Sequence, residues 1–225
     1  MQNIQLLKWT EQIGIWPYWN ILAGFQGEPI EEYGRMVDLV SLLVHLPPPS
    51  FCTKIILSRF SPYFMEAKKY GLVNIRPLKS YGFVYLFTEI SLHSLVYFFD
   101  YDYSDHRNVD KYIFRLNKEV SVWKELWNRE KPPELTMANI GEMIIIKDTR
   151  PCSVQRLCIL TGKEKDLYEL CETIQRFDEL VLIMHKRYPN IVEEEVKTLL
   201  TELCSKKLLV KDNKGYLALA LRWTN

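Results

Sequence analysis

The stretch from Trp19 to Glu28 (WNILAGFQGE) is the first part of the chain whose residue types suggest ligand chemistry. It begins as an apolar strand and continues into a turn that contains Gly24 and Gly27. Glycines let the backbone approach a bound group closely, and ligands of α/β folds commonly lie at turns that follow the carboxyl ends of strands. The pattern therefore predicts a ligand-binding turn here, as an expectation from fold alone.

A second group of polar residues, Arg59, Ser61 and Tyr63, directly follows the next expected strand (54–58). The planar guanidinium of Arg59 suits the bidentate recognition of a carboxylate. An alternative interpretation is that Arg59 pairs with a neighbouring acid, and that Ser61 and Pro62 start a helix as its N-cap and first residue. Substrate binding and local structure both stay open for these residues.

Two aspartates, Asp100 and Asp102, stand within the aromatic run YFFDYDY (97–103). Their carboxylates suit a cation or a peptide amine, and the aromatic rings suit stacking against the side chains of a peptide. The alternative is that the aspartates cap a loop and the rings pack in a core. Asp100 is therefore a candidate substrate-binding residue, while the catalytic residues stay unknown.

Cysteine and histidine spacing predicts no metal site. The five cysteines contain no CxxC pair, and free cysteine is commonly a buried core residue. His45 and His93 have no second ligand three or four residues away, and His106 and His185 stand in polar surroundings. The cysteines are Cys52, Cys152, Cys158, Cys171 and Cys204.

The composition predicts a globular chain whose net charge does not favour a strongly charged binding partner. The 225 residues are 48% hydrophobic and 25% charged, and 29 basic against 28 acidic residues leave a net charge of +1. This balance provides no long-range field to attract nucleic acid or anionic lipid. The first residues form neither a signal peptide nor a long apolar run, so we expect a cytoplasmic protein without DNA or membrane partners.

Helices and strands alternate through the first two thirds of the chain, which is typical of a parallel α/β sheet. Beyond a joint at Asp148-Thr149-Arg150-Pro151, three expected helices and a β-hairpin follow, as in a winged helix. We therefore expect a domain at 1–148 and a second at 149–225. The expected helices are 2–13, 29–44, 89–97, 109–127, 163–172, 176–186 and 191–205, and the expected strands are 16–23, 54–58, 82–87, 134–138, 143–147, 208–212 and 216–219.

The order of several short motifs resembles one enzyme family. The run LKWTEQIGIWPYWNILAGFQGEPIEEY is similar to the later half of a radical S-adenosylmethionine (radical SAM) barrel, in which an asparagine-bearing strand enters a GFPGE-like turn. HLPPP, RFSPYF, Tyr70-Gly71, Arg76-Pro77, YFFD, DTRP and GYLALAL follow in the order seen in the cobalamin-type maturases of ribosomally made peptides, the peptide C-methyltransferases. The resemblance covers nearly all of the chain, and its specificity lies in the succession of motifs.

The resemblance implies a partial (β/α) barrel followed by a winged-helix-like α+β domain. It also implies an iron–sulfur cluster and cobalamin, but the chain lacks the family's CxxxCxxC triplet and its cobalamin domain. We therefore expect those cofactors on a separate chain that supplies the amino-terminal half of the enzyme. S-adenosylmethionine would bind only when that partner completes the site.

Four residues match the family's cofactor edge: Asn20, Gly24, Gly27 and Glu28. The resemblance makes them candidates for binding S-adenosylmethionine, although Gln26 stands where the family usually has proline. The alternative interpretation is that Asn20 caps the end of a strand and Glu28 suits the positive end of a helix dipole.

A precursor peptide is the expected substrate partner. Winged-helix modules in such enzymes hold a leader peptide as an added strand, and the 208–219 hairpin or the 143–147 strand is the expected edge. Binding of DNA is not expected, because Glu193, Glu194 and Glu195 open the helix that would face the phosphates. The sequence thus predicts the C-terminal part of a peptide-maturation enzyme; the alternatives are a non-catalytic peptide-binding or regulatory remnant and a decayed fragment.

Overall fold

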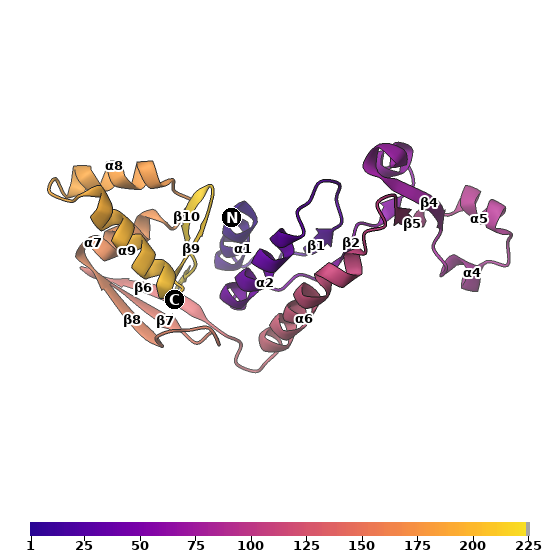
Figure 1. The fold of residues 1–225 in the computed structure, drawn as a ribbon. Coiled ribbons are helices and arrows are strands. Elements are labelled where there is room, and N and C mark those ends of the chain that lie inside the picture. Colours follow the sequence, from indigo (N-terminus) through magenta and orange to yellow (C-terminus); the bar gives the residue numbers. More distant parts are fainter. Residues whose placement is uncertain (224–225) are drawn as a thin grey trace. The chain divides into compact units, whose positions relative to one another are not determined.

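The computed structural model describes residues 1–223 and shows a mixed α/β fold that divides into two compact units (Figure 1). Unit 1 comprises residues 1–18, 38–48 and, within the described part, 119–223, whereas unit 2 comprises residues 19–37 and 49–118. The helices α2 (Glu31–Leu43) and α6 (Val109–Trp127) each contribute to both units. Among the described residues, no helix has the length and the apolar character needed to cross a membrane.

Unit 2 opens with two short parallel strands. β1 (Asn20–Ala23) pairs with β2 (Phe51–Lys54), in a register that joins Asn20 to Phe51 and Ala23 to Lys54. The apolar strand, the turn and the helix that follow one another at the start of this unit therefore form as expected. β1 is shorter than the strand expected at 16–23. The strand expected at 54–58 does not form as one element, because Lys54 ends β2 and Leu57–Ser58 form β3 of another sheet.

The second sheet of unit 2 is antiparallel and has the order β3–β5–β4. Its strands are β3 (Leu57–Ser58), β4 (Leu72–Pro77) and β5 (Phe98–Tyr103). Phe99, Tyr101 and Tyr103 are buried and alternate along β5 with more exposed residues. The aromatic run at 97–103 is thus a strand rather than a loop. Within residues 1–223 the sheets are separate and no barrel closes.

The strand expected at 82–87 is wrong. The structure forms the short helix α4 (Tyr81–Val84) there, with Tyr85 N–H donating to the carbonyl of Tyr81, and no strand pairs with the segment that follows. Phe83 and Leu86 are 90% and 101% exposed. A short apolar run predicts a buried strand only where a neighbouring strand is available. The remaining helices wholly in unit 2 are α3 (Pro62–Met65), the 3₁₀ helix η1 (Ala67–Tyr70) and α5 (Glu89–Leu95).

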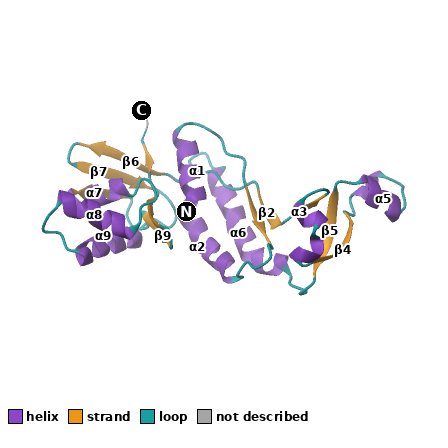
Figure 2. Cartoon of the chain, turned by 90° about the horizontal axis from the view of Figure 1, so that it is seen from above, coloured by secondary structure: helices purple, strands orange, loops and turns teal. Residues whose placement is uncertain are grey.

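Unit 1 contains a four-stranded sheet with the order β11–β6–β7–β8. β6, β7 and β8 are antiparallel neighbours, and the two-residue β11 adds to β6 in parallel. Helices α7, α8 and α9 gather on one face of this sheet in both views (Figure 2). The strands are β6 (Leu135–Ile140), β7 (Met143–Asp148), β8 (Leu157–Thr161) and β11 (Leu221–Arg222).

Three helices and a hairpin follow β8, close to the positions that the sequence predicts. They are α7 (Gly162–Leu170), α8 (Phe177–Arg187), α9 (Glu193–Ser205), β9 (Leu209–Asp212) and β10 (Gly215–Ala218). The first helix of the unit is α1 (Gln2–Gln12). The core includes Trp123 of α6, which is 1% exposed and whose Nε1 donates to the carbonyl of Leu46 at 2.8 Å.

Candidate functional site

The turn after β1 is closed by the carboxylate of Glu28. Its Oε2 accepts hydrogen bonds from the backbone N–H groups of Gly24 and Phe25, each at 3.0 Å, and from the hydroxyl of Tyr33. Burial and this hydrogen bond raise the pKa of Tyr33, which keeps its hydroxyl a donor. Glu28 therefore holds the turn by satisfying backbone groups that the chain reversal leaves unpaired.

The two glycines of this turn serve different purposes. Gly24 has φ +90°, and a Cβ on it would lie 2.1 Å from the hydroxyl oxygen of Tyr103. Gly27 has φ +82°, but a Cβ there would meet nothing within 4 Å. Both positions thus need the conformational freedom of glycine. Only Gly24 also needs its small size.

Asn20 lies apart from the other candidate cofactor residues. It is the first residue of β1, and its Oδ1 accepts from the backbone N–H of Phe51 at 3.1 Å. Gly24 follows the other end of the strand, roughly 13 Å away at the usual rise of an extended chain. The structure brings Gly24, Gly27 and Glu28 together in one turn and places Asn20 at the opposite end of β1.

Arg59 is engaged with the end of α5. Its Nε donates to the carbonyl of Val96 at 2.7 Å and its Nη2 to the carbonyl of His93, both near the carboxyl end of that helix. The guanidinium carbon lies 5.0 Å from the ring centroid of Phe99. These contacts favour a helix-capping role for Arg59 over the clamping of a substrate carboxylate.

Ser61 and Tyr63 also have structural partners. Ser61 is the N-cap of α3, and its Oγ accepts from the backbone N–H of Phe64 at 3.2 Å. The ring of Tyr63 lies 4.2 Å from that of Tyr70 and 5.9 Å from that of Phe25, centroid to centroid. Ser61 therefore starts a helix, and Tyr63 links that helix to the turn that contains Phe25.

Asp100 of β5 is the centre of an ion-pair network that joins the two sheets of unit 2. Lys54 Nζ and Arg76 Nη2 each lie 2.9 Å from its carboxylate, and Arg76 also contacts Asp102 at 3.1 Å. Burial acts to raise the pKa of Asp100, but the hydrogen bond from Lys54 and the two cations outweigh it and hold that pKa below its usual value. Asp100 is thus ionised and already paired with cations of its own chain.

The cysteines carry no thiolate character. Burial raises the pKa of Cys52 to about 11 and that of Cys171 to about 12, and it also raises the pKa values of Cys152, Cys158 and Cys204. Because thiolates are the form that attacks substrates, these environments disfavour a nucleophilic role. No group of three or more potential metal-binding side chains occurs within the described residues. The described side chains thus form no ligand set for an iron–sulfur cluster.

An open sheet edge lies in unit 1, at β8. Within the described part of the chain, no strand pairs with its outer side. The strand expected to provide an edge, 143–147, is instead β7, which lies between β6 and β8 and has both sides paired. That expectation was wrong because β8 (LCILT), whose residues alternate between exposed and buried in the structure, is absent from the expected strands.

The hairpin of β9 and β10 offers less room for an added strand. Tyr216 exchanges backbone hydrogen bonds with Gln175 at 2.9 and 3.1 Å, and Ala218 N–H donates to Cys171 O at 2.7 Å. Gly215 has φ +140°, and a Cβ on it would lie 2.1 Å from the carbonyl oxygen of Gln175. The chain itself therefore covers the outer side of β10.

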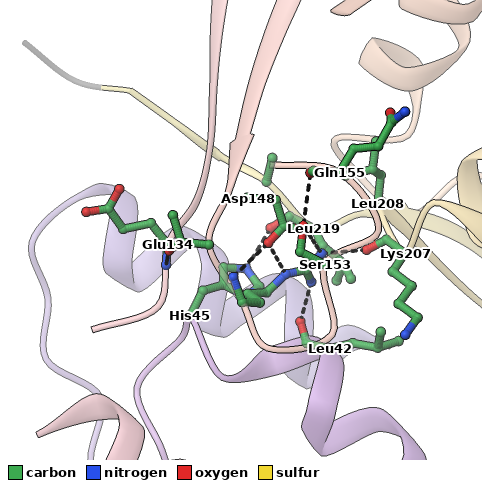
Figure 3. A network of polar contacts seen from close by, with 12 residues as sticks. Leu42, His45, Glu134, Asp148, Ser153, Gln155, Lys207, Leu208 and Leu219 are labelled. Carbon is green, nitrogen blue, oxygen red and sulfur yellow. Dashed lines mark hydrogen bonds and ion pairs between the residues drawn. The ribbon is translucent and has the colours of Figure 1, made fainter. Parts of the chain in front are cut away.

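The sequence did not indicate the buried polar cluster of unit 1, of which Figure 3 shows the part around His45 and Asp148. Arg150 is fully buried beside Asp148, and His45 and Lys8 are 3% and 2% exposed. His45 Nε2 lies 3.0 Å from the carbonyl oxygen of Leu219, and Lys8 Nζ donates to the carbonyl of Ala218. Asp148 and Arg150 lie two residues apart in the DTRP motif, but Lys8 and His45 are distant from them in the sequence, so only the fold brings all four together.

The chain was compared with family models, curated proteins and solved structures. No family model, no curated protein and no solved structure matches it.

Proposed function

We propose that this chain binds a ribosomal precursor peptide as a strand added to the outer side of β8, and that it does so as the C-terminal part of a radical SAM peptide-maturation system. The open edge of β8 is the observation that carries the proposal. In the proposal a separate chain supplies the iron–sulfur cluster and the cobalamin for C-methylation. In the proposal, residues 149–225 are the winged-helix-like module that holds the peptide.

Backbone geometry supports strand addition at this edge. Asp148 N–H donates to the carbonyl of Arg156 at 3.0 Å, and the antiparallel register pairs Ile146 with Cys158. Because hydrogen-bonding direction alternates along an antiparallel strand, the N–H and C=O groups of Leu157, Ile159 and Thr161 point away from β7. An extended peptide meets these groups as a new neighbouring strand.

Side chains along β8 indicate which peptide the edge suits. Leu157 and Ile159 are 60% and 54% exposed, whereas Cys158 and Leu160 are buried. Side chains of an added strand stand on the same two faces, directly beside those of β8. We therefore expect a peptide with branched aliphatic or aromatic residues at alternate positions, which pack against Leu157 and Ile159.

Proline substitution at this edge tests the proposal. Ile159→Pro removes an outward N–H and leaves the hydrogen bonds to β7 intact, because proline is compatible with the free side of an edge strand. Isothermal titration of the full chain with the precursor peptide encoded beside its gene should show binding to the wild type and to Ile159→Val, and at least tenfold weaker binding to Ile159→Pro. Equal affinity of all three proteins would refute strand addition at β8.

A second candidate function, a peptide-binding remnant that takes part in no catalysis, is favoured by the polar groups of the β1 turn. Glu28 Oε2 and Asn20 Oδ1 accept hydrogen bonds from their own chain, so both oxygens already have local structural partners. Copurification separates the two functions. If this chain is part of the maturation enzyme, a cluster-bearing chain encoded nearby should copurify with it. If it is a non-catalytic remnant, the peptide should bind but no cluster-bearing chain should copurify.

A further inference from the structure

A hollow on unit 1 collects four cationic side chains at one end of the four-stranded sheet. Its volume is about 350 Å³, near the lower end of the range usual for sites that bind small molecules. β6 and β8 begin at this end of the sheet, and β7 ends there. The cations that line the hollow are Arg129, Lys131, Lys147 and Arg156.

Three of these four cations have no carboxylate partner. Lys147 Nζ lies 2.5 Å from Glu134 Oε2, and Glu134 is the one carboxylate among the described residues that line the hollow. Within residues 1–223, Arg129, Lys131 and Arg156 take part in no ion pair. The hollow therefore has an excess of three positive charges, which repel one another in the free protein.

The backbone that carries these side chains is held in place on both sides of the hollow. Thr149 N–H donates to the carbonyl of Glu134 at 2.8 Å, and Glu134 N–H donates to Thr149 Oγ1, also at 2.8 Å. Pro132, Pro133 and Pro151 line the hollow as well, and their rings restrict the backbone between the cations. The points from which the cationic side chains extend are therefore preorganised, which lowers the entropic cost of binding an anion.

Charge and shape together indicate a phosphate monoester as the ligand. Two of the unpaired cations are arginines, whose planar guanidinium groups bind phosphate with two parallel hydrogen bonds. A single carboxylate offsets only one of the excess charges, whereas a phosphate monoester carries nearly two at neutral pH and offers three acceptor oxygens. Nucleic acid is usually bound by cations spread along a stripe or a face, but these cations lie around one hollow.

We infer that this hollow binds the phosphate group of a small phosphate monoester. Arg129 and Arg156 donate hydrogen bonds to the phosphate oxygens, and Lys131 offsets further charge. The walls leave room for a small organic body beside the phosphate. This site goes beyond the proposed function and does not depend on strand addition at β8.

Two matched probes test the inference on the full chain. Phenyl phosphate and phenyl sulfate have the same ring and a tetrahedral head group, but at neutral pH the first is mainly a dianion and the second a monoanion. In titrations followed by ¹⁵N–¹H NMR, phenyl phosphate should bind about fivefold more tightly, as expected for one more charge among surface cations. It should also shift the amide signals of Arg129, Lys131 and Arg156. Equal affinities, no binding of phenyl phosphate, or shifts centred elsewhere in the chain would overturn the inference.

Substitution of the two arginines tests the site itself. Arg129→Gln combined with Arg156→Gln should weaken the binding of phenyl phosphate about tenfold, because it removes both guanidinium groups. The matched control is Arg35→Gln combined with Arg115→Gln, which removes the same charge from exposed positions outside the hollow and should keep the wild-type affinity. Equal losses in the two double variants would mean attraction by net charge alone and would contradict a built site.

Two further measurements leave the hollow unchanged. A phosphate monoester takes up its second proton near pH 6, while arginine and lysine stay charged. At about pH 5 the affinity for phenyl phosphate should therefore fall close to that for phenyl sulfate, and any protonation of Glu134 acts on both probes alike. An undiminished preference at that pH would contradict recognition of the dianion. Ile159→Pro should leave the binding of phenyl phosphate unchanged, so a failure of strand addition is separable from a failure of this site.

Discussion

Arg150 and Asp148 form an ion pair in the interior of unit 1, with 2.7 Å between Nη2 and Oδ2 and side-chain exposures of 0% and 2%. Two further bonds extend from the same guanidinium, to the carbonyl oxygens of Leu42 and Lys207, each at 2.7 Å (Figure 3). One side chain therefore joins the end of β7 to the end of α2 and to the segment before β9. Such a charge is tolerated in an interior because its N–H groups meet a carboxylate and two carbonyl oxygens.

Arg150→Met should destabilise the protein strongly. The substitution leaves the carboxylate of Asp148 buried without its counter-ion, a change that typically costs about 3–5 kcal/mol. Urea unfolding at neutral pH measures the loss. The control is Arg222→Met, since Arg222 pairs with Glu172 while 58% exposed, and a surface pair contributes about 1 kcal/mol or less. Equal losses in both variants would contradict a structural role for the buried pair.

Gly24 and Gly27 should respond differently to alanine. Both variants place a side chain at positive φ, at a cost of about 1–2 kcal/mol. Only Gly24→Ala also drives a Cβ against Tyr103, which adds about 1–3 kcal/mol of overpacking. In thermal unfolding, Gly24→Ala should therefore have a lower melting temperature than Gly27→Ala. Adding Tyr103→Phe to Gly24→Ala should recover part of the difference. A larger effect at Gly27 would disagree with this packing.

Glu28→Gln tests whether this carboxylate holds the turn. Glutamine keeps one side-chain oxygen but lacks the charge that strengthens the bonds from Gly24 N–H, Phe25 N–H and Tyr33 O–H. We expect a loss of about 1–3 kcal/mol and faster hydrogen exchange at those two amides. Glu31→Gln is the control, because Glu31 lies in the first turn of α2. Unchanged exchange in Glu28→Gln would remove the structural role and strengthen a role in ligand binding.

The elements of residues 162–218 were largely predictable from the sequence, because their cues are local. The helical periodicity of the apolar residues predicts the last helix. The turn-forming Asn213-Lys214-Gly215 predicts the hairpin that follows, and neither cue depends on distant residues. The region around α4 was not predictable in this way. GFVYLF has strand-forming residues, but whether it forms a strand depends on a neighbouring strand that no local pattern reports.

The same limit applies to the candidate sites. The sequence identified Glu28 and Ser61 correctly as polar residues at a turn and at a helix start, since capping chemistry acts over a few residues. The partners of Asp100 come from positions 54 and 76, and His45 meets Leu219 across 174 residues. Contacts of this range follow from the fold and not from spacing in the sequence.

Lys8 should make stability depend on alkaline pH. It is 2% exposed, and burial lowers its pKa from 10.5 to about 8, against the opposing charge of Glu172. Between these two values the unfolded chain holds a proton at Lys8 that the folded chain has released. Stability rises with pH wherever the unfolded state binds more protons. The contribution of Lys8 to the free energy of unfolding should therefore increase from pH 8 to 10.5, by about 3 kcal/mol at the ordinary value per pKa unit.

Urea unfolding of the wild type and of Lys8→Met at several pH values isolates this contribution, because the other lysines and the tyrosines titrate in both proteins. The difference in unfolding free energy between them should be constant below pH 8 and should then move in favour of the wild type up to pH 10.5. Lys197→Met, which removes an exposed lysine paired with Glu194, should run parallel to the wild type. A difference that stays constant over this range would mean that Lys8 keeps an ordinary pKa and therefore has a charged partner or water at its Nζ.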